Sequence, residues 1–195
     1  MLRLDLAPSF KQSQRTLAAF CARKGNIATV QDISHTLAAV FQRGNKVLVC
    51  GNGGSSCDAM HFAEEFVCKL RRDRMALPAI ALTETSALLA AANDYGFEHV
   101  FARGVEAYGR PGDLLVAIST SGDSPNIIRA VKAARLKKMI TVGLLGRDGG
   151  KMRGTCDFEL TVTGETSDRI QEVHMAILHI IIEGVERVLF PENYR

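Results

Sequence analysis

The chain has 195 residues, of which 47% are hydrophobic and 23% are charged, and its formal net charge is +3. This length fits one compact domain with a hydrophobic core, and the ordinary composition excludes a largely disordered chain. Nucleic-acid binding has little support, because the basic run Arg71–Arg74 is interrupted by Asp73 and has no aromatic residues interleaved with it.

Cysteine usage and hydropathy indicate a cytoplasmic protein. The five cysteines form no CxxC pair and no zinc-finger spacing, and their odd number argues against a disulfide framework. The N-terminal segment lacks the continuous apolar core of a signal peptide, and no stretch is long enough to span a bilayer. We therefore expect a soluble protein of the reducing cytoplasm, with neither a membrane nor a nucleic acid as partner.

The N-terminal part of the chain, about residues 1–43, is predicted to be helical. Apolar residues recur at three- and four-residue steps between Ser9 and Gln42, and Gly25-Asn26 is expected to divide the pattern into two helices. A long N-terminal helix with an apolar face that a small domain does not cover often packs on another subunit. We interpret this segment as an oligomerisation element.

The remainder, about residues 44–195, alternates short apolar runs with helical patterns. Strands that alternate with helices indicate an α/β fold, a three-layer sandwich in which helices cover both faces of a mostly parallel sheet. The residues Asn93-Asp94-Tyr95-Gly96 are predicted to form a turn. We expect residues 1–195 to form a single domain. Strands are predicted at 47–50, 79–82, 114–118, 140–145 and 158–162, and helices at 56–70, 86–92, 100–107, 125–137 and 167–190.

A glycine-rich loop follows the first predicted strand, in the segment CGNGGSSCDAMHFAEE at residues 50–65. Its glycines permit a sharp turn close to a ligand, and the N–H groups that open the next helix favour an anion. A dinucleotide-binding GxGxxG would require glycine in place of Ser56, and the Gly-Lys-Ser/Thr of a P-loop is absent, so no nucleotide cofactor is expected. His61 and Glu65 share one face of the helix. The segment indicates chemistry on a phosphorylated small molecule.

A second loop, rich in hydroxyl groups, follows the third predicted strand. It reads Ser119-Thr120-Ser121-Gly122-Asp123-Ser124 and precedes a helix that begins with Pro125. Ligands of open parallel sheets sit at the carboxyl ends of the strands, so both loops are expected to face one site. A serine-rich turn alone is common, but hydroxyl and amide groups at a helix N-terminus suit a phosphate dianion.

The C-terminal helix carries two histidines with different expected roles. His174 is expected to be a satisfied core residue. His179 lies within an apolar run, where burial without a polar partner is costly, and Glu65 or a metal ion could supply that partner. Gln171 lies about 80° from His179 around the helix axis, so the two side chains can line one stripe.

Five segments stand in an order and at spacings that match a known family. They are GNGGSSCDAMHFAEE, AANDYGFEHVFAR, ISTSGDSPNI, GRDGGKM and DRIQEVHMAILHIIIE. Together they resemble the phosphoheptose isomerases of the sugar isomerase (SIS) domain superfamily, and the similarity covers nearly the whole chain. The loops alone mark the superfamily, whereas His61, Glu65, Gln171 and His179 together are specific to the enzyme group. The resemblance implies a flavodoxin-like SIS fold and a homotetramer with active sites between subunits.

The resemblance also implies a reaction and a set of site residues. The reaction converts sedoheptulose 7-phosphate into D-glycero-D-manno-heptose 7-phosphate, the first step toward the heptose of lipopolysaccharide core and related glycans. Ser56 replaces the histidine or alanine of relatives, and the connection at residues 163–167 varies in the family, so contacts at the sugar end stay open. In several members zinc is held by residues that match His61, Glu65, Gln171 and His179, and a zinc ion in each site is expected here. The implied substrate-binding residues are Asn52, Gly53, Gly54, Asn93, Asp94, Ser119, Thr120, Ser121, Ser124 and Gln171.

An aldose–ketose isomerisation needs chemical groups that these residues can supply. A proton moves between adjacent carbons through an enediol, which requires a base for the carbon-bound proton and an acid for the oxygens. We hypothesise that Glu65 carries the carbon proton, that His179 assists proton transfer on the opposite side, and that Gln171 orients a substrate oxygen. Two alternatives remain: a binding protein of the kind that engages a replication initiator, and a regulatory module that senses a phosphosugar. Both resemble the enzyme in the loops but do without the acid/base pair.

Overall fold

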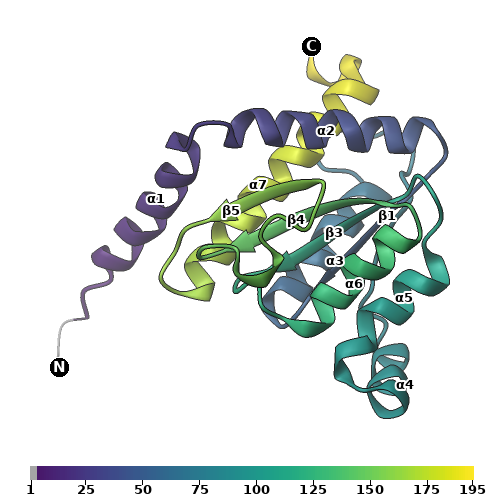
Figure 1. The fold of residues 1–195 in the computed structure, drawn as a ribbon. Helices are drawn as coiled ribbons and strands as arrows, with labels where there is room; N and C mark the ends of the chain where they lie inside the picture. Colours follow the sequence, from purple (N-terminus) through teal and green to yellow (C-terminus); the bar gives the residue numbers. More distant parts are fainter. Residues whose placement is uncertain (1–3) are drawn as a thin grey trace.

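The computed structural model describes residues 4–195, so residues 1–3 of the expected domain lie outside the described residues. Two helices open the chain, α1 (Ala7–Ala22) and α2 (Asn26–Gln42), and they confirm the predicted break at Gly25. Figure 1 shows α2 running along one side of the sheet, whereas α1 projects away from it toward the N-terminus.

Five strands form a sheet in which every neighbouring pair is parallel, in the order β2-β1-β3-β4-β5. The central strands β1 and β3 are buried along their whole length, which explains their continuous apolar runs. The order is that of flavodoxin-like folds, and it confirms the expected fold class. The strands are β1 (Val47–Gly51), β2 (Ala79–Ala81), β3 (Leu114–Ser119), β4 (Ile140–Gly146) and β5 (Phe158–Val162).

Helices cover both faces of this sheet (Figure 1). On one face α2, α3 and α7 pack against Val47, Val49 and their neighbours, and on the other α4, α5 and α6 pack against Leu48 and Cys50. Across residues 4–195, none of the helices combines the length and the apolar character that crossing a membrane requires. The helices after β1 are α3 (Gly54–Val67), α4 (Thr85–Tyr95), α5 (Val100–Tyr108), α6 (Pro125–Leu136) and α7 (Ser167–Leu189), with short 3-10 turns at Phe97–His99, Gly150–Met152 and Pro191–Tyr194.

The predicted turn at residues 93–96 is wrong. Asn93, Asp94 and Tyr95 form the last turn of α4, and the helix ends at Gly96, whose φ of 91° lies in the region that favours glycine. At its start, the carboxylate of Glu84 accepts hydrogen bonds from the backbone N–H groups of Ser86 and Ala87. This cap fixes the first turn of α4 one residue earlier than predicted.

The bounds of α3 also differ from the prediction. The helix begins at Gly54 rather than Ser56 and ends at Val67 rather than Leu70. The backbone leaves the helical conformation at Cys68, where ψ is −103°, and the side chain of Arg74 donates hydrogen bonds to the carbonyl groups of Phe66 and Cys68. Those carbonyls lie in the final turn, where intrahelical partners are missing.

Candidate active site

The loop between β1 and α3 brings the start of α3 against α7. The backbone N–H of Ser55 donates to the carbonyl of Asn52, which closes the turn after β1. A Cβ atom at Gly54 would lie 2.6 Å from the amide nitrogen and oxygen of Gln171, so a larger residue here would displace the end of this side chain. Gln171 also approaches the hydroxyl of Ser55, with Nε2 and Oγ 3.5 Å apart. Glycine at position 54 therefore leaves room for the amide group of Gln171 at the start of α3.

Two imidazoles and a carboxylate meet between α3 and α7. The Nε2 atoms of His61 and His179 are 3.1 Å apart, and the Nε2 atom of His61 lies 3.4 Å from Oε1 of Glu65. The two rings meet edge to face, with centroids 5.0 Å apart. The predicted shared face of His61 and Glu65 is confirmed by this contact, and His179 finds its polar partner in His61.

This cluster has the donor atoms and the spacing of a metal site. A ligand atom of each of His61, Glu65 and His179 lies within 4.8 Å of the others. Ligands of a tetrahedral zinc ion stand about 2.0–2.2 Å from the metal, and hence roughly 3.3–3.5 Å from one another, which is close to the two observed distances. Nitrogen and carboxylate oxygen are also the ligand types that zinc accepts. The three residues therefore fit zinc without a large rearrangement.

The second loop gathers hydroxyl groups at the carboxyl end of β3. The Oγ atom of Ser119 accepts a hydrogen bond from the N–H of Gly122 and lies 3.4 Å from Oγ of Ser124. Thr120 contacts the hydroxyl of Ser167 at 3.3 Å, which ties the loop to the first residue of α7. The loop thus joins the N-termini of α6 and α7, and both helices present a favourable end to an anion.

The two loops are joined by a pair of asparagine side chains. Nδ2 of Asn52 donates to Oδ1 of Asn126 at 2.9 Å, and Nδ2 of Asn126 donates back to Oδ1 of Asn52 at 2.8 Å. Asn126 is buried in the first turn of α6, where its Oδ1 also accepts from the N–H of Ile127. Sequence reasoning missed Asn126, because nothing in the pattern of an amphipathic helix shows that a polar residue near its start bonds to a distant loop.

The family model for the SIS domain matches residues 10–146. The phosphoheptose isomerase of Fusobacterium nucleatum is 53% identical over 191 residues, which is 98% of each chain. Solved phosphoheptose isomerases from Neisseria gonorrhoeae and Francisella tularensis superpose with TM-scores of 0.84 and 0.88, at 42% and 33% identity, and each covers 93% of this chain and 96% of its own. The chain belongs to the phosphoheptose isomerase family.

Membership in this family decides between the classes that the sequence left open. The similarity extends beyond the shared loops, since it covers 98% of the chain. The protein is therefore an isomerase that acts on a phosphosugar.

Asn93 and Asp94 are the candidate residues that the structure leaves apart from this cluster. Both are exposed in the last turn of α4, and the amide of Asn93 donates to Oδ1 of Asp94 at 2.8 Å. In the part of the chain that the structure describes, no hydrogen bond joins either side chain to the loops or to α7. Figure 1 shows α4 at the edge of the molecule beside α5. Their contact with substrate in this phosphoheptose isomerase stays a prediction.

Two buried titratable groups lie close to the site. His174 is fully buried, its Nε2 bonds to the carbonyl of Leu145 at 3.0 Å, and burial lowers its pKa to about 4. It is a core residue, as predicted, but it is only partly satisfied, because its buried Nδ1 has no hydrogen-bond partner among the described residues. Asp58, one turn before His61, has a pKa raised to about 6 because burial disfavours the carboxylate, while His61 acts in the opposite direction. The helical pattern of this segment does not indicate that Asp58 is buried.

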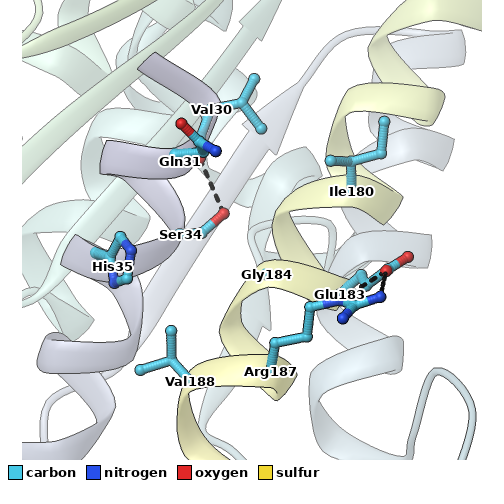
Figure 2. A pocket seen from close by; sticks show the side chains of 9 residues that line it. All are labelled: Val30, Gln31, Ser34, His35, Ile180, Glu183, Gly184, Arg187 and Val188. Carbon is cyan, nitrogen blue, oxygen red and sulfur yellow. Dashed lines mark hydrogen bonds and ion pairs between the residues drawn. The ribbon is translucent and has the colours of Figure 1, made fainter. Parts of the chain in front are cut away.

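A groove between α2 and α7 is distinct from the candidate site. It has a volume of about 420 Å³, and Figure 2 shows Ile180 and Val188 on α7 facing His35 and Val30 on α2. On its α7 side, Arg187 pairs with Glu183. None of the residues predicted for substrate or metal lines it. It is lined by Val30, Gln31, Ser34, His35, Ile180, Glu183, Gly184, Arg187 and Val188.

Proposed function

We propose that the protein interconverts sedoheptulose 7-phosphate and D-glycero-D-manno-heptose 7-phosphate, the first step toward the heptose of lipopolysaccharide core or related glycans. The observation that carries this proposal is the meeting of His61, Glu65 and His179 between α3 and α7, in a chain that also carries the hydroxyl-rich loop and matches phosphoheptose isomerases along nearly its whole length. The loops alone would serve a sensor or a binding protein, whereas the acid/base cluster serves catalysis.

Binding of the phosphate is assigned to the loop after β3. Ser119, Thr120, Ser121 and Ser124 supply hydroxyl groups, and the first turn of α6 supplies backbone N–H groups. Such donors make short, charge-assisted hydrogen bonds to a phosphate dianion. Asn52, Gly53 and Gly54 then approach the sugar chain, with Asn93 and Asp94 as further substrate contacts and Gln171 orienting a substrate oxygen.

Proton transfer is assigned to Glu65 and His179. In the direction from ketose to aldose, Glu65 takes the proton from C1, the enediol forms, and the same carboxyl group returns a proton to C2. His179 moves the proton between the oxygens at C1 and C2 as the carbonyl group changes place. Zinc held by His61, Glu65, Gln171 and His179 would polarise the substrate carbonyl when bound. A carboxylate that binds a metal is a weaker base, so the two assignments to Glu65 need separate measurements.

Substitution of the two proposed catalytic residues tests the mechanism. We expect Glu65→Gln and His179→Ala each to lower kcat with sedoheptulose 7-phosphate by about 100- to 10,000-fold, the usual contribution of a positioned acid or base. The measurement is formation of the aldose product, with bound zinc quantified in each variant. Glu64→Gln is the matched control, because Glu64 is an exposed neighbour on the same helix. Near-normal activity in either variant would remove that residue from the mechanism.

We propose further that the protein is a cytoplasmic homotetramer and that residues 1–195 form one SIS domain. All five cysteines are free thiols, which is consistent with a reducing compartment. Leu6, Phe10 and Leu17 on α1 are exposed apolar side chains, and the groove of Figure 2 adds Ile180 and Val188 on α7. Apolar surface of this kind supports contact between subunits.

A further inference from the structure

We infer that Arg74 and Glu186 are positioning residues of the active site, which hold α3 and α7 so that Glu65 and His61 face His179. Neither side chain touches the cluster itself. The inference rests on the active site proposed above, and it concerns two residues to which the sequence analysis assigned no role in the site. Its basis is a buried network at the ends of the two helices that carry the reacting groups.

Arg74 closes the C-terminal end of α3. Its side chain is 1% exposed, and its guanidinium group donates to the carbonyls of Glu65, Phe66 and Cys68 at 2.6, 2.6 and 2.9 Å. Carbonyls in the last turn of a helix lack intrahelical partners, and a cation there is favoured by the helix dipole. Because the fork of donors is rigid, these bonds fix the backbone of Glu65 as well as the helix end.

Glu186, on α7, is the ion-pair partner of Arg74 in this network. Its side chain is also 1% exposed, and it accepts hydrogen bonds from Nε of Arg74 at 3.0 Å, the N–H of Leu70 at 3.3 Å and the hydroxyl of Tyr194 at 2.8 Å. Every polar atom of the buried pair is thus bonded to a neighbour. Removal of either partner would leave an uncompensated buried charge.

The position of Glu186 on α7 connects the network to the site. Glu186 follows His179 by seven residues, close to two helical turns, so the two side chains lie on nearly the same face of the helix. The carbonyl bonded to Arg74 belongs to Glu65 itself. One end of the network is therefore fixed to a proposed catalytic residue, and the other sets the rotation of the helix that carries the second. A small rotation of either helix would separate the nitrogen atoms that now lie 3.1 Å apart.

A second buried ion pair offers a matched control. Asp113 is 1% exposed, pairs with Nζ of Lys46 and accepts from the backbone N–H of Arg110. It lies immediately before β3, and Lys46 lies immediately before β1, so this pair sits at the amino ends of the strands, opposite the loops that follow β1 and β3. Loss of either pair removes a buried charge contact, but only the pair of Arg74 and Glu186 is joined to α3 and α7.

The experiment compares Arg74→Lys, Glu186→Gln and Asp113→Asn in the full-length protein. Three quantities are measured: kcat and KM with sedoheptulose 7-phosphate, affinity for Zn²⁺ alone in competition with a chelator, and the midpoint of thermal unfolding. We expect Arg74→Lys and Glu186→Gln to lower kcat and Zn²⁺ affinity at least tenfold, since loss of a group that orients metal ligands commonly costs 10- to 100-fold. Asp113→Asn is expected to lower the unfolding midpoint while kcat and Zn²⁺ affinity stay within about twofold of wild type.

Several outcomes would overturn the positioning role. It is wrong if Arg74→Lys and Glu186→Gln lose stability like Asp113→Asn but keep wild-type kcat and Zn²⁺ affinity. If both fail to fold, Tyr194→Phe decides, since it deletes one hydrogen bond to Glu186 and must lower kcat or Zn²⁺ affinity measurably.

A wild-type protein that turns over substrate but binds no Zn²⁺ refutes only the metal assignment, and the kcat values of the variants still test the pair of Arg74 and Glu186. A wild-type protein that binds Zn²⁺ but does not convert sedoheptulose 7-phosphate refutes only the substrate assignment. The Zn²⁺ affinities of the variants then still test the role of Arg74 and Glu186. Failure of both leaves nothing to position and overturns the inference.

Discussion

At the scale of single residues, two histidines on α7 show how neighbours in sequence acquire opposite roles. His174 is enclosed by the core and bonds to the carbonyl of Leu145, whereas His179 is half-buried and meets His61. Helical periodicity predicted that His61 and Glu65 share a face and that His179 needs a partner. It could not predict that the nearest partner is His61, because that depends on how closely α3 and α7 approach.

Burial of His174 predicts a pH-dependent stability. Its pKa is about 4 in the folded protein against about 6.5 in the unfolded chain. The unfolded state therefore binds an extra proton between these values, so the free energy of unfolding is fully retained above pH 6.5 and falls as the pH drops to 4, by on the order of 3 kcal/mol. His174→Gln should lose this part of the dependence, as measured by urea unfolding at pH 7 and pH 5.

Asp58 contributes to the same pH range with the opposite sign. Its pKa is raised to about 6 in the folded protein, so the folded state binds the extra proton between about pH 4 and pH 6, and stability from this group increases as the pH falls. We expect Asp58→Asn to make the protein more stable at pH 7 and to steepen its loss of stability in acid. If the dependence of the unfolding free energy on pH is the same in His174→Gln and Asp58→Asn as in wild type, burial does not shift the pKa of either group.

At the scale of elements, the sequence predicted that the loops after β1 and β3 lie together, because parallel strands end at one edge of the sheet. It did not predict the link between them. The reciprocal bonds of Asn52 and Asn126 hold the first loop to the first turn of α6. Periodicity also failed at the end of α4, where Gly96 rather than Asn93 stops the helix. Both misses concern side-chain and backbone details that a pattern of apolar residues does not encode.

The asparagine link predicts a selective effect on substrate binding. Asn126→Ala removes both bonds and leaves the amide of Asn52 without its partner, so the loops should lose their relative position. We expect KM for sedoheptulose 7-phosphate to rise about tenfold, roughly 1.4 kcal/mol, with kcat reduced much less. Steady-state kinetics at fixed ionic strength measure this, and Asn193→Ala, which affects an exposed bond to the carbonyl of Asp73, is the control. Equal KM values in the two variants would contradict the link's role.

At the scale of the whole molecule, alternation of apolar runs and helical patterns was sufficient to predict the three-layer fold and to bring the loops after β1 and β3 to one edge of the sheet. The set of substrate residues was less predictable: Asn93 and Asp94 lie on α4, away from the cluster on α3 and α7. A single chain need not bring them together if each site is completed by another subunit. The oligomeric state therefore bears directly on the active site.

The exposed apolar face of α1 permits a test of the oligomeric state. Phe10 is 73% exposed, and in Figure 1 its helix stands apart from the sheet, where another subunit could pack on it. We expect wild type to have four times the 21.2 kDa chain mass in solution, and Phe10→Glu to form smaller species with lower activity, because a charge would be buried in the contact.

Size-exclusion chromatography with light scattering measures the mass of wild type and of the Phe10→Glu variant. Leu136→Glu, at a side chain that is 86% exposed on α6, is the control for added charge alone. A monomeric wild type with full activity would exclude active sites shared between subunits.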